Sequence, residues 1–135
     1  MGGEVGQASA LKMCYAALTK GLSALLTESV VAAEAHGVAG ALREELADSQ
    51  PRFLAGARRL PDVVPKAYRW VAEMEEIAAT FEQVGLKPRM LLGAADVYRL
   101  VEAARVGAAE PMDGLDVVVT ELRRALLEAS SRPAR

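Results

Sequence analysis

The chain has only one cysteine and one histidine, which is too few to build a disulfide-stabilised fold or a cysteine- and histidine-based metal centre. Its single cysteine, Cys14, excludes an internal disulfide and any cysteine cluster for a metal ion. In the middle of a predicted helix it is expected to be a small buried side chain. The single histidine, His36, stands at a predicted helix end beside Gly37, which favours an interaction with the helix dipole over catalysis. Aromatic residues make up only 4% of the chain, so its core must be built from small side chains.

The chain also lacks a strong charge bias and a targeting segment. It has 16 basic and 18 acidic residues and a formal net charge of -2, so no basic field points to nucleic acid. No apolar signal segment opens the sequence, and no run approaches the roughly 18 apolar residues of a membrane span. We therefore expect a cytoplasmic protein whose partners are neither nucleic acid nor membrane.

The residues that are present favour helices. The 135 residues suffice for one domain, and 52% of them are hydrophobic, with alanine, leucine and valine most common. The sequence predicts an all-α fold of five to six helices packed around a long N-terminal helix. We expect a flexible, glycine-rich start over residues 1–7, a helical domain over 8–130 and a frayed tail over 131–135. The predicted helices are 9–36, 38–47, 52–60, 65–84, 89–106 and 115–129.

Glycine and proline residues set these predicted helix boundaries. Gly37 and Gly85 follow the last periodic residues of two helices, as C-terminal capping glycines do. Pro61 is expected to break a helix, and Pro65 suits the start of the next one. Gly21 interrupts the first helix, which suggests close packing there.

The first helix has two different faces. At about 100° per residue, one arc is small and polar around lysine, and the other is rich in leucine. A lysine beside apolar packing can act as a general acid or base, so Lys12 is the first candidate for chemistry; the alternative is a solvated lysine. The polar arc holds Ser9, Lys12, Thr19, Lys20, Ser23 and Thr27, and the apolar arc holds Leu11, Leu18, Leu22, Leu25, Leu26 and Ala33.

The fourth predicted helix carries a possible ion pair. Arg69 and Glu73 stand at i,i+4, a spacing typical of a weak surface pair. Trp70, the only tryptophan, is expected in the core or an interface.

No dinucleotide-binding fingerprint is found, because the early glycines follow no predicted strand and have the wrong spacing.

Two segments resemble a known family: GQASALKMCYAALTKGLSALLTE and KAYRWVAEMEEIAATFEQVGLKPRM. They are similar to the C-terminal helical domain of 6-phosphogluconate-dehydrogenase-like proteins of the β-hydroxyacid dehydrogenase superfamily. The resemblance is closer to a subgroup whose C-terminal domain is of unknown function, and it covers roughly residues 6–100. In that family a Rossmann domain precedes the helical domain, which closes the substrate site and usually builds the dimer interface.

The resemblance implies specific roles. Lys12 matches the lysine that assists proton transfer at the substrate hydroxyl during hydride transfer to NAD(P). The possible substrate contacts are Ser9, Tyr15, Thr19 and Arg69.

The chain also departs from the family pattern. Ala16 stands where the superfamily has an asparagine, with Tyr15 beside it as a possible hydroxyl donor. A later Lys-Asp motif falls near Glu73-Met74, so its lysine is missing. We therefore do not carry over 6-phosphogluconate as the substrate.

The leading hypothesis is the substrate-binding and dimerisation domain of an NAD(P)-dependent dehydrogenase. Without a Rossmann domain the chain is not expected to transfer hydride alone or to bind the cofactor itself. We expect a homodimer, a Rossmann domain in cis or in trans, and a small polar or phosphorylated hydroxy acid as substrate. The alternatives are a free-standing helical interaction module and a cofactor-free lyase or isomerase that uses Lys12.

Overall fold

The structure, a computed structural model, describes residues 4–132, and the all-α fold predicted from the sequence is confirmed. Within the described residues, six helices of eight or more residues are joined by short connections and one single-turn helix. The elements are α1 (Glu4–Ala35), α2 (Ala39–Ser49), α3 (Pro51–Arg58), α4 (Leu60–Val63), the 3-10 helix η1 (Val64–Lys66), α5 (Ala67–Glu82), α6 (Arg89–Gly107) and α7 (Leu115–Ser130).

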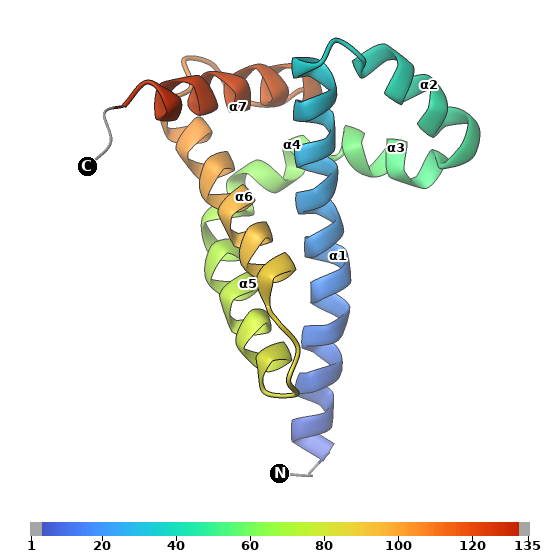
Figure 1. Cartoon of the computed structure of the whole chain (residues 1–135), viewed down its shortest axis with the longest axis vertical. Coiled ribbons are helices and arrows are strands. Elements are labelled where there is room, and N and C mark those ends of the chain that lie inside the picture. Colours follow the sequence, from blue (N-terminus) through green and yellow to red (C-terminus); the bar gives the residue numbers. More distant parts are fainter. Residues whose placement is uncertain (1–3, 133–135) are drawn as a thin grey trace.

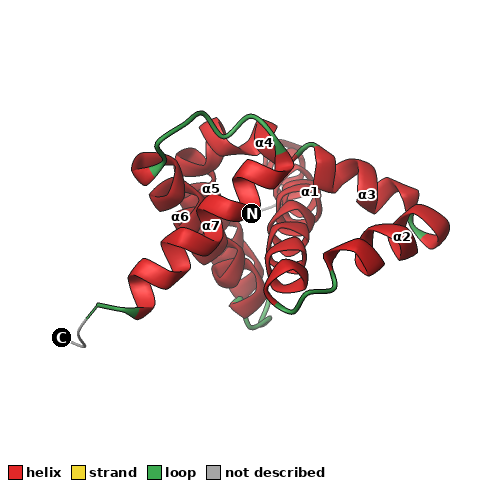
Figure 2. Cartoon of the chain, turned by 90° about the horizontal axis from the view of Figure 1, so that it is seen from above, coloured by secondary structure: helices red, strands yellow, loops and turns green. Residues whose placement is uncertain are grey.

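Helix α1 is the axis of the molecule. Its 32 residues span about 48 Å, and every other long helix contacts it. Figure 1 shows the antiparallel pair α5–α6 lying along α1, with α7 crossing near its C-terminal end. The α2–α3 hairpin projects to the opposite side, as the view from above shows (Figure 2).

The core is made of small side chains at the places where helices meet. Ala67, Ala95 and Ala104 are completely buried, and alanine lets two helix backbones approach closely. The largest fully buried side chains are Tyr98, Met74, Leu122 and Val118. This composition agrees with the scarcity of aromatic residues in the sequence.

The predicted capping glycines are confirmed. Gly37 and Gly85 have φ values of 73° and 89°, the left-handed conformation that favours glycine. At the end of α1, the amide of Val38 donates to the carbonyl of Ala33 at 2.8 Å, and the amide of Gly37 donates to Glu34 at 3.1 Å. Such bonds satisfy the free carbonyls of the last turn and end the helix.

Three local expectations were wrong. A Cβ at Gly21 would meet nothing within 4 Å, so this glycine does not mark close packing. Pro61 lies inside α4, because a proline in the first turn of a helix removes no internal hydrogen bond. Helix α1 begins at Glu4, inside the stretch expected to be flexible, while residues 1–3 and 133–135 lie outside the described part.

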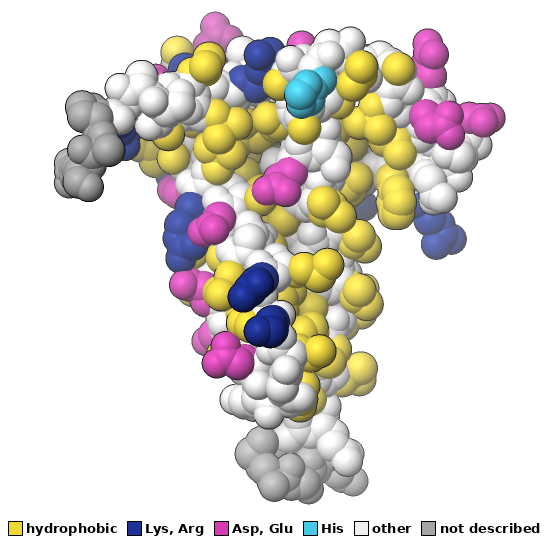
Figure 3. Space-filling model, viewed as in Figure 1, with side chains coloured by type: hydrophobic (Ala, Val, Ile, Leu, Met, Phe, Trp, Pro, Cys, Tyr) yellow, Lys and Arg dark blue, Asp and Glu magenta, His cyan; other side chains and the backbone are white. Residues whose placement is uncertain are grey.

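One side of α1 is an exposed apolar face. We call it the leucine stripe: Leu11, Tyr15, Leu18, Leu22 and Leu25, which are between 44% and 71% exposed. In Figure 3 hydrophobic side chains gather along this edge of α1 and beneath the α2–α3 hairpin. Cys14 is exposed rather than buried, because it also points away from the helices that pack on α1.

The composition of α1 also meets a length and hydropathy criterion for crossing a membrane. The segment Gly6–Ala35 has a window of mean hydropathy 1.2, of which 22% is buried. The sequence-based expectation that no run approaches such a span was therefore too strict. The face of α1 opposite the leucine stripe packs on α5 and α6, so in this fold the helix acts as the axis of a bundle.

Candidate functional site

A groove of about 350 Å³ lies between α1 and α5. One face of α1 and the facing side of α5 contribute its walls, because residues three or four apart on a helix share a face. Its lining residues are Ser9, Lys12, Met13, Ala16 and Lys20 from α1, and Glu73, Glu76 and Ile77 from α5. The groove is open to solvent along much of its length.

Lys20 and Glu73 form an ion pair across the groove. The Lys20 side chain is only 22% exposed, and the Glu73 side chain is 41% exposed. Burial lowers the pKa of Lys20 below its ordinary value, and the positive charges of Arg69 and Lys12 lower it further.

Aromatic side chains support Lys20 from the core side. Its Nζ lies 5.1 Å from the centre of the Trp70 ring, within the range of a cation–π contact. The Trp70 ring meets the Tyr98 ring edge-on, with centroids 5.3 Å apart and an interplanar angle of 87°. The Tyr98 hydroxyl donates a hydrogen bond to the main-chain carbonyl of Lys20. Both the backbone and the ammonium group of Lys20 are therefore held in place.

The structure brings together only some of the predicted site residues. Ser9 and Lys12 line the groove, and Lys12 is solvent-exposed. Tyr15 belongs to the leucine stripe, on another face of α1, and is 68% exposed. Thr19 is exposed and donates a hydrogen bond to the carbonyl of Ala16 at 3.4 Å.

The ion pair predicted within α5 is replaced by one between helices. Glu73 pairs with Lys20, not with Arg69. The Arg69 guanidinium lies 5.9 Å from the centre of the Tyr68 ring instead, outside the lining of the groove. Arg69 acts on the site through its charge, as one cause of the lowered pKa of Lys20.

Sequence reasoning missed the pairing of Lys20 with Glu73. Lys12 and Lys20 are eight residues apart, and the helical wheel already places both on the same arc. Which acidic side chain faces them depends on the antiparallel register of α1 and α5, for which the sequence carries no local signal.

Comparison with protein families identifies the central part of the chain. Residues 33–101, just over half of the chain, match the family model described as Domain of unknown function (DUF1932). The chain belongs to this family. No curated protein matches the chain.

The DUF1932 match covers one wall of the groove. It runs from the end of α1 through α5 and into α6, so it includes Glu73, Glu76 and Ile77. The other wall, with Lys12 and Lys20, lies before the matched segment. The groove therefore joins the family domain to the long helix that precedes it.

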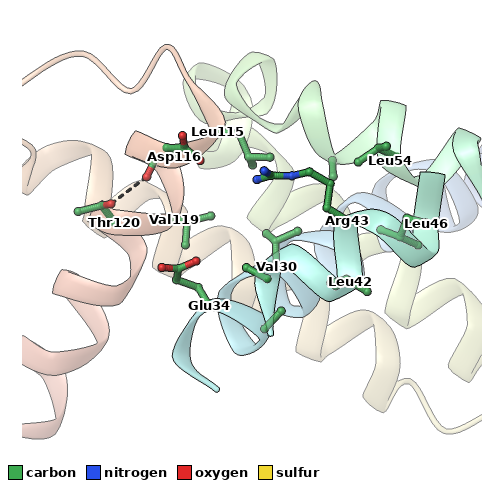
Figure 4. A pocket seen from close by; sticks show the side chains of 13 residues that line it. Val30, Glu34, Leu42, Arg43, Leu46, Leu54, Leu115, Asp116, Val119 and Thr120 are labelled. Atoms are coloured by element: carbon green, nitrogen blue, oxygen red, sulfur yellow. Dashed lines mark hydrogen bonds between the residues drawn. The ribbon is translucent and has the colours of Figure 1, made fainter. Parts of the chain in front are cut away.

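A second cavity lies at the other end of α1. It measures about 150 Å³ and is lined by residues of α1, the α2–α3 hairpin and the start of α7. Figure 4 shows apolar side chains around it, with the Arg43 side chain extending toward Leu115. The Thr120 hydroxyl at its edge donates to the carbonyl of Asp116 at 2.8 Å. None of the predicted site residues lines this cavity.

The described residues contain neither a strand–turn–helix unit for a dinucleotide nor a cluster of metal-ligating side chains. Residues 4–132 have no strand, so they contain no strand–turn–helix unit of the kind that cradles a pyrophosphate. The same residues contain no group of three or more histidine, cysteine, aspartate or glutamate side chains placed to hold a metal ion. The chemistry that this groove offers is that of lysine, carboxylate and hydroxyl groups.

Proposed function

We propose that this chain is the substrate-binding and dimerisation domain of an NAD(P)-dependent dehydrogenase of the 3-hydroxyacid type. The observation that carries the proposal is the groove that places Lys12 and Ser9 against the DUF1932 part of the chain. Domains of this family follow NAD(P)-binding dehydrogenase domains, which supports the same function.

In this proposal Lys12 is the general acid/base. Oxidation of a hydroxyl to a carbonyl releases the hydroxyl proton, and the Lys12 amine accepts it at Nζ; in the reverse direction the ammonium returns it. An exposed position suits this role, because the amine must exchange its proton with solvent between turnovers. Ser9, one turn earlier in α1, donates or accepts a hydrogen bond at the same end of the groove.

A nicotinamide cofactor would be held by a separate nucleotide-binding domain, since the described residues form no cradle for it. That domain stands in the same polypeptide or in a partner chain. Its docking over the groove would exclude water from the reacting hydroxyl, which strengthens the electrostatic contacts there.

The leucine stripe supports the dimerisation part of the proposal. Its residues follow a 4-3-4-3 spacing over about 21 Å, the repeat with which two helices pack along a common seam. From Gln7 to Ser29 no charged residue stands on this half of the helix. Such a face is self-complementary and favours the α1 of a second copy, packed antiparallel; a helical module that binds a different protein is the alternative.

Turnover of hydroxy acids tests the proposal directly. The chain is combined with the nucleotide-binding domain encoded in the same or a neighbouring reading frame, and NAD and NADP reduction is followed. Lys12→Ala is expected to lower kcat by about 100-fold or more. Because Lys12 is exposed, circular dichroism and the thermal midpoint should stay unchanged.

Lys87→Ala is the matched control, because Lys87 is an exposed lysine in the connection between α5 and α6. It should leave kcat unchanged. Equal turnover by the wild type and Lys12→Ala would exclude the acid/base role. Tight binding of NAD(P)H by the chain alone would contradict the assignment of the cofactor to another domain.

A further inference from the structure

The α2–α3 hairpin, residues 39–58, is attached to the rest of the fold by very few buried contacts. Of these residues, all of which the structure describes, Ala57 alone is buried. Among the described residues, no side-chain hydrogen bond or ion pair joins the hairpin to another helix. Helix α6, of similar length, has seven buried residues. Elements with few buried contacts are the ones that move most readily.

Both ends of the hairpin are suited to act as hinges. Gly37, before α2, has a φ of +73° and open space around it, since a Cβ built there would meet nothing within 4 Å. After α3, Leu60 is 3% exposed, so the chain is anchored again directly beyond Arg59. Between the two ends, Gly56 lies against Leu26 of α1, where a Cβ would come within 3.0 Å of the leucine Cδ1 atom. This close contact provides a point about which the hairpin can turn.

The cavity of about 150 Å³ beside the hairpin leaves room for such a turn. Leu42, Leu46 and Leu54 line it from the hairpin and remain partly accessible to solvent. Leu115 and Val119 line it from α7. A movement of the hairpin toward α7 would bring these two apolar walls together and remove their surfaces from water, which is favourable.

Opposite charges stand on the two sides of the same cavity. Figure 4 shows the Arg43 side chain extending from α2 toward Leu115 at the start of α7, and Asp116 is the next residue of α7. The ion pairs of the described residues include neither Arg43 nor Asp116. Glu34 adds a second carboxylate from α1. Approach of the hairpin to α7 therefore brings a guanidinium toward carboxylates, and their attraction grows as the distance falls.

We propose that the α2–α3 hairpin is a hinged cover that closes on the start of α7 as one unit, with Arg43 and Asp116 forming an ion pair in the closed state. The structure shows the open state, in which the cavity is present. The closure is independent of the proposed dehydrogenase chemistry, because no residue of the groove lies in the hairpin. It does affect the leucine stripe: Figure 3 shows hydrophobic side chains along the stripe and beneath the hairpin, so turning the hairpin changes the shape of the apolar surface that a partner meets.

Nuclear magnetic resonance of the intact chain tests the closure. Relaxation dispersion of backbone amides reports exchange between two states on the microsecond-to-millisecond timescale of hinge motions. Exchange with one common rate is expected in residues 39–58 and in residues 115–120, which lie on the two sides of the cavity. Helices α5 and α6 should not share this exchange, because the hairpin closes on α7.

Three variants change the two states in different ways. Asp116→Asn and Arg43→Gln should each lower the closed population about two- to fivefold, the factor expected for loss of an exposed ion pair. Ala39→Leu places a larger side chain in the cavity, which should hold the hairpin open and remove the exchange. The matched control is Asp96→Asn, because the Asp96 carboxylate is exposed in α6 and lies outside the cavity. It should leave the exchange unchanged, and circular dichroism should show the same helix content in all variants.

Three results would each overturn the proposal. The first is the absence of exchange in residues 39–58 and 115–120 of the wild type. The second is exchange at different rates in α2 and α3, which would mean that each helix frays separately and that the hairpin does not move as one unit. The third is a closed population in Asp116→Asn and Arg43→Gln equal to that of the wild type, which would exclude the ion pair of the closed state.

Discussion

The hydroxyl of Tyr98, buried in α6, donates a hydrogen bond to the main-chain carbonyl of Lys20 in α1. This bond joins residues 78 positions apart and fixes α1 on the α5–α6 pair beside the groove. It connects the stability of the fold to the position of a groove residue.

Tyr98→Phe removes the hydroxyl and its bond to the Lys20 carbonyl but keeps the buried ring. We expect the free energy of unfolding to fall by about 1 kcal/mol, because the ring still fills its place while the carbonyl loses a partner. Urea denaturation measures the change. Tyr68→Phe is the control, since Tyr68 is 61% exposed and should give no change. Equal stability of Tyr98→Phe and wild type would mean that water replaces the hydroxyl at no cost.

The same tyrosine predicts a loss of stability at alkaline pH. Burial raises the pKa of Tyr98 above its ordinary value of 10.0, so the folded state keeps the proton that the unfolded chain releases. Above about pH 10 the unfolded state therefore binds fewer protons, and the free energy of unfolding falls as the pH rises. Urea titrations on either side of pH 10 should show this fall in wild type and a smaller one in Tyr98→Phe. A fall of the same size in both proteins would assign it to other groups.

Substitution by alanine should change the free energy of unfolding in opposite directions at two glycines, one inside α1 and one just after its end. Gly21→Ala should raise the free energy of unfolding by about 0.5–1 kcal/mol, because Gly21 lies in a helix and its new Cβ meets nothing within 4 Å. Gly37→Ala should lower it by about 1 kcal/mol, because φ is +73° there. Thermal unfolding of both variants measures the contrast. A destabilised Gly21→Ala would indicate that a partner approaches α1 at this position.

The leucine stripe predicts self-association that a single charge removes. Leu18 stands at its centre and is 66% exposed. Leu18→Lys should convert a dimer into a monomer, as judged by sedimentation velocity, without loss of helix content. Leu86→Lys is the control, because Leu86 is 56% exposed but lies in the α5–α6 connection. If the wild-type chain is monomeric at high concentration, the leucine stripe is not a dimer interface, and binding of a different protein to the stripe becomes the favoured hypothesis.

The sequence predicted the helices whose apolar spacing is regular and whose ends carry glycine. The helix expected over 65–84 is present as α5 (Ala67–Glu82), and Met74, Ile77 and Ala78 of its periodic set are buried. Helix α1 shows why the rest was not predictable. Its leucines form the clearest apolar arc, yet the structure buries small residues such as Ala17 and Ala24 against α5 and α6. A helical wheel identifies an apolar face but not the element that covers it.

The candidate site was also predictable only in part, for the same reason. Lys12 and Ser9 were candidates because their chemistry and spacing are local properties of α1. Glu73 joined the site only through the packing of α5 on α1, which brings it to Lys20, 53 positions earlier in the chain. Local spacing suggested Arg69 as its partner, but Lys20, packed against Trp70, takes that place.

The position of α1 also bears on how the chain folds. Helices α5 and α6 are joined by six residues, so their pairing closes a short loop and needs little chain entropy. The contacts of α1 with α6 close loops of many tens of residues, and contacts of that kind form slowly. We therefore expect the α5–α6 pair to nucleate folding and α1 to dock late, although α1 comes first in the sequence. Substitutions on α1 would then mainly speed unfolding, while those between α5 and α6 would slow folding.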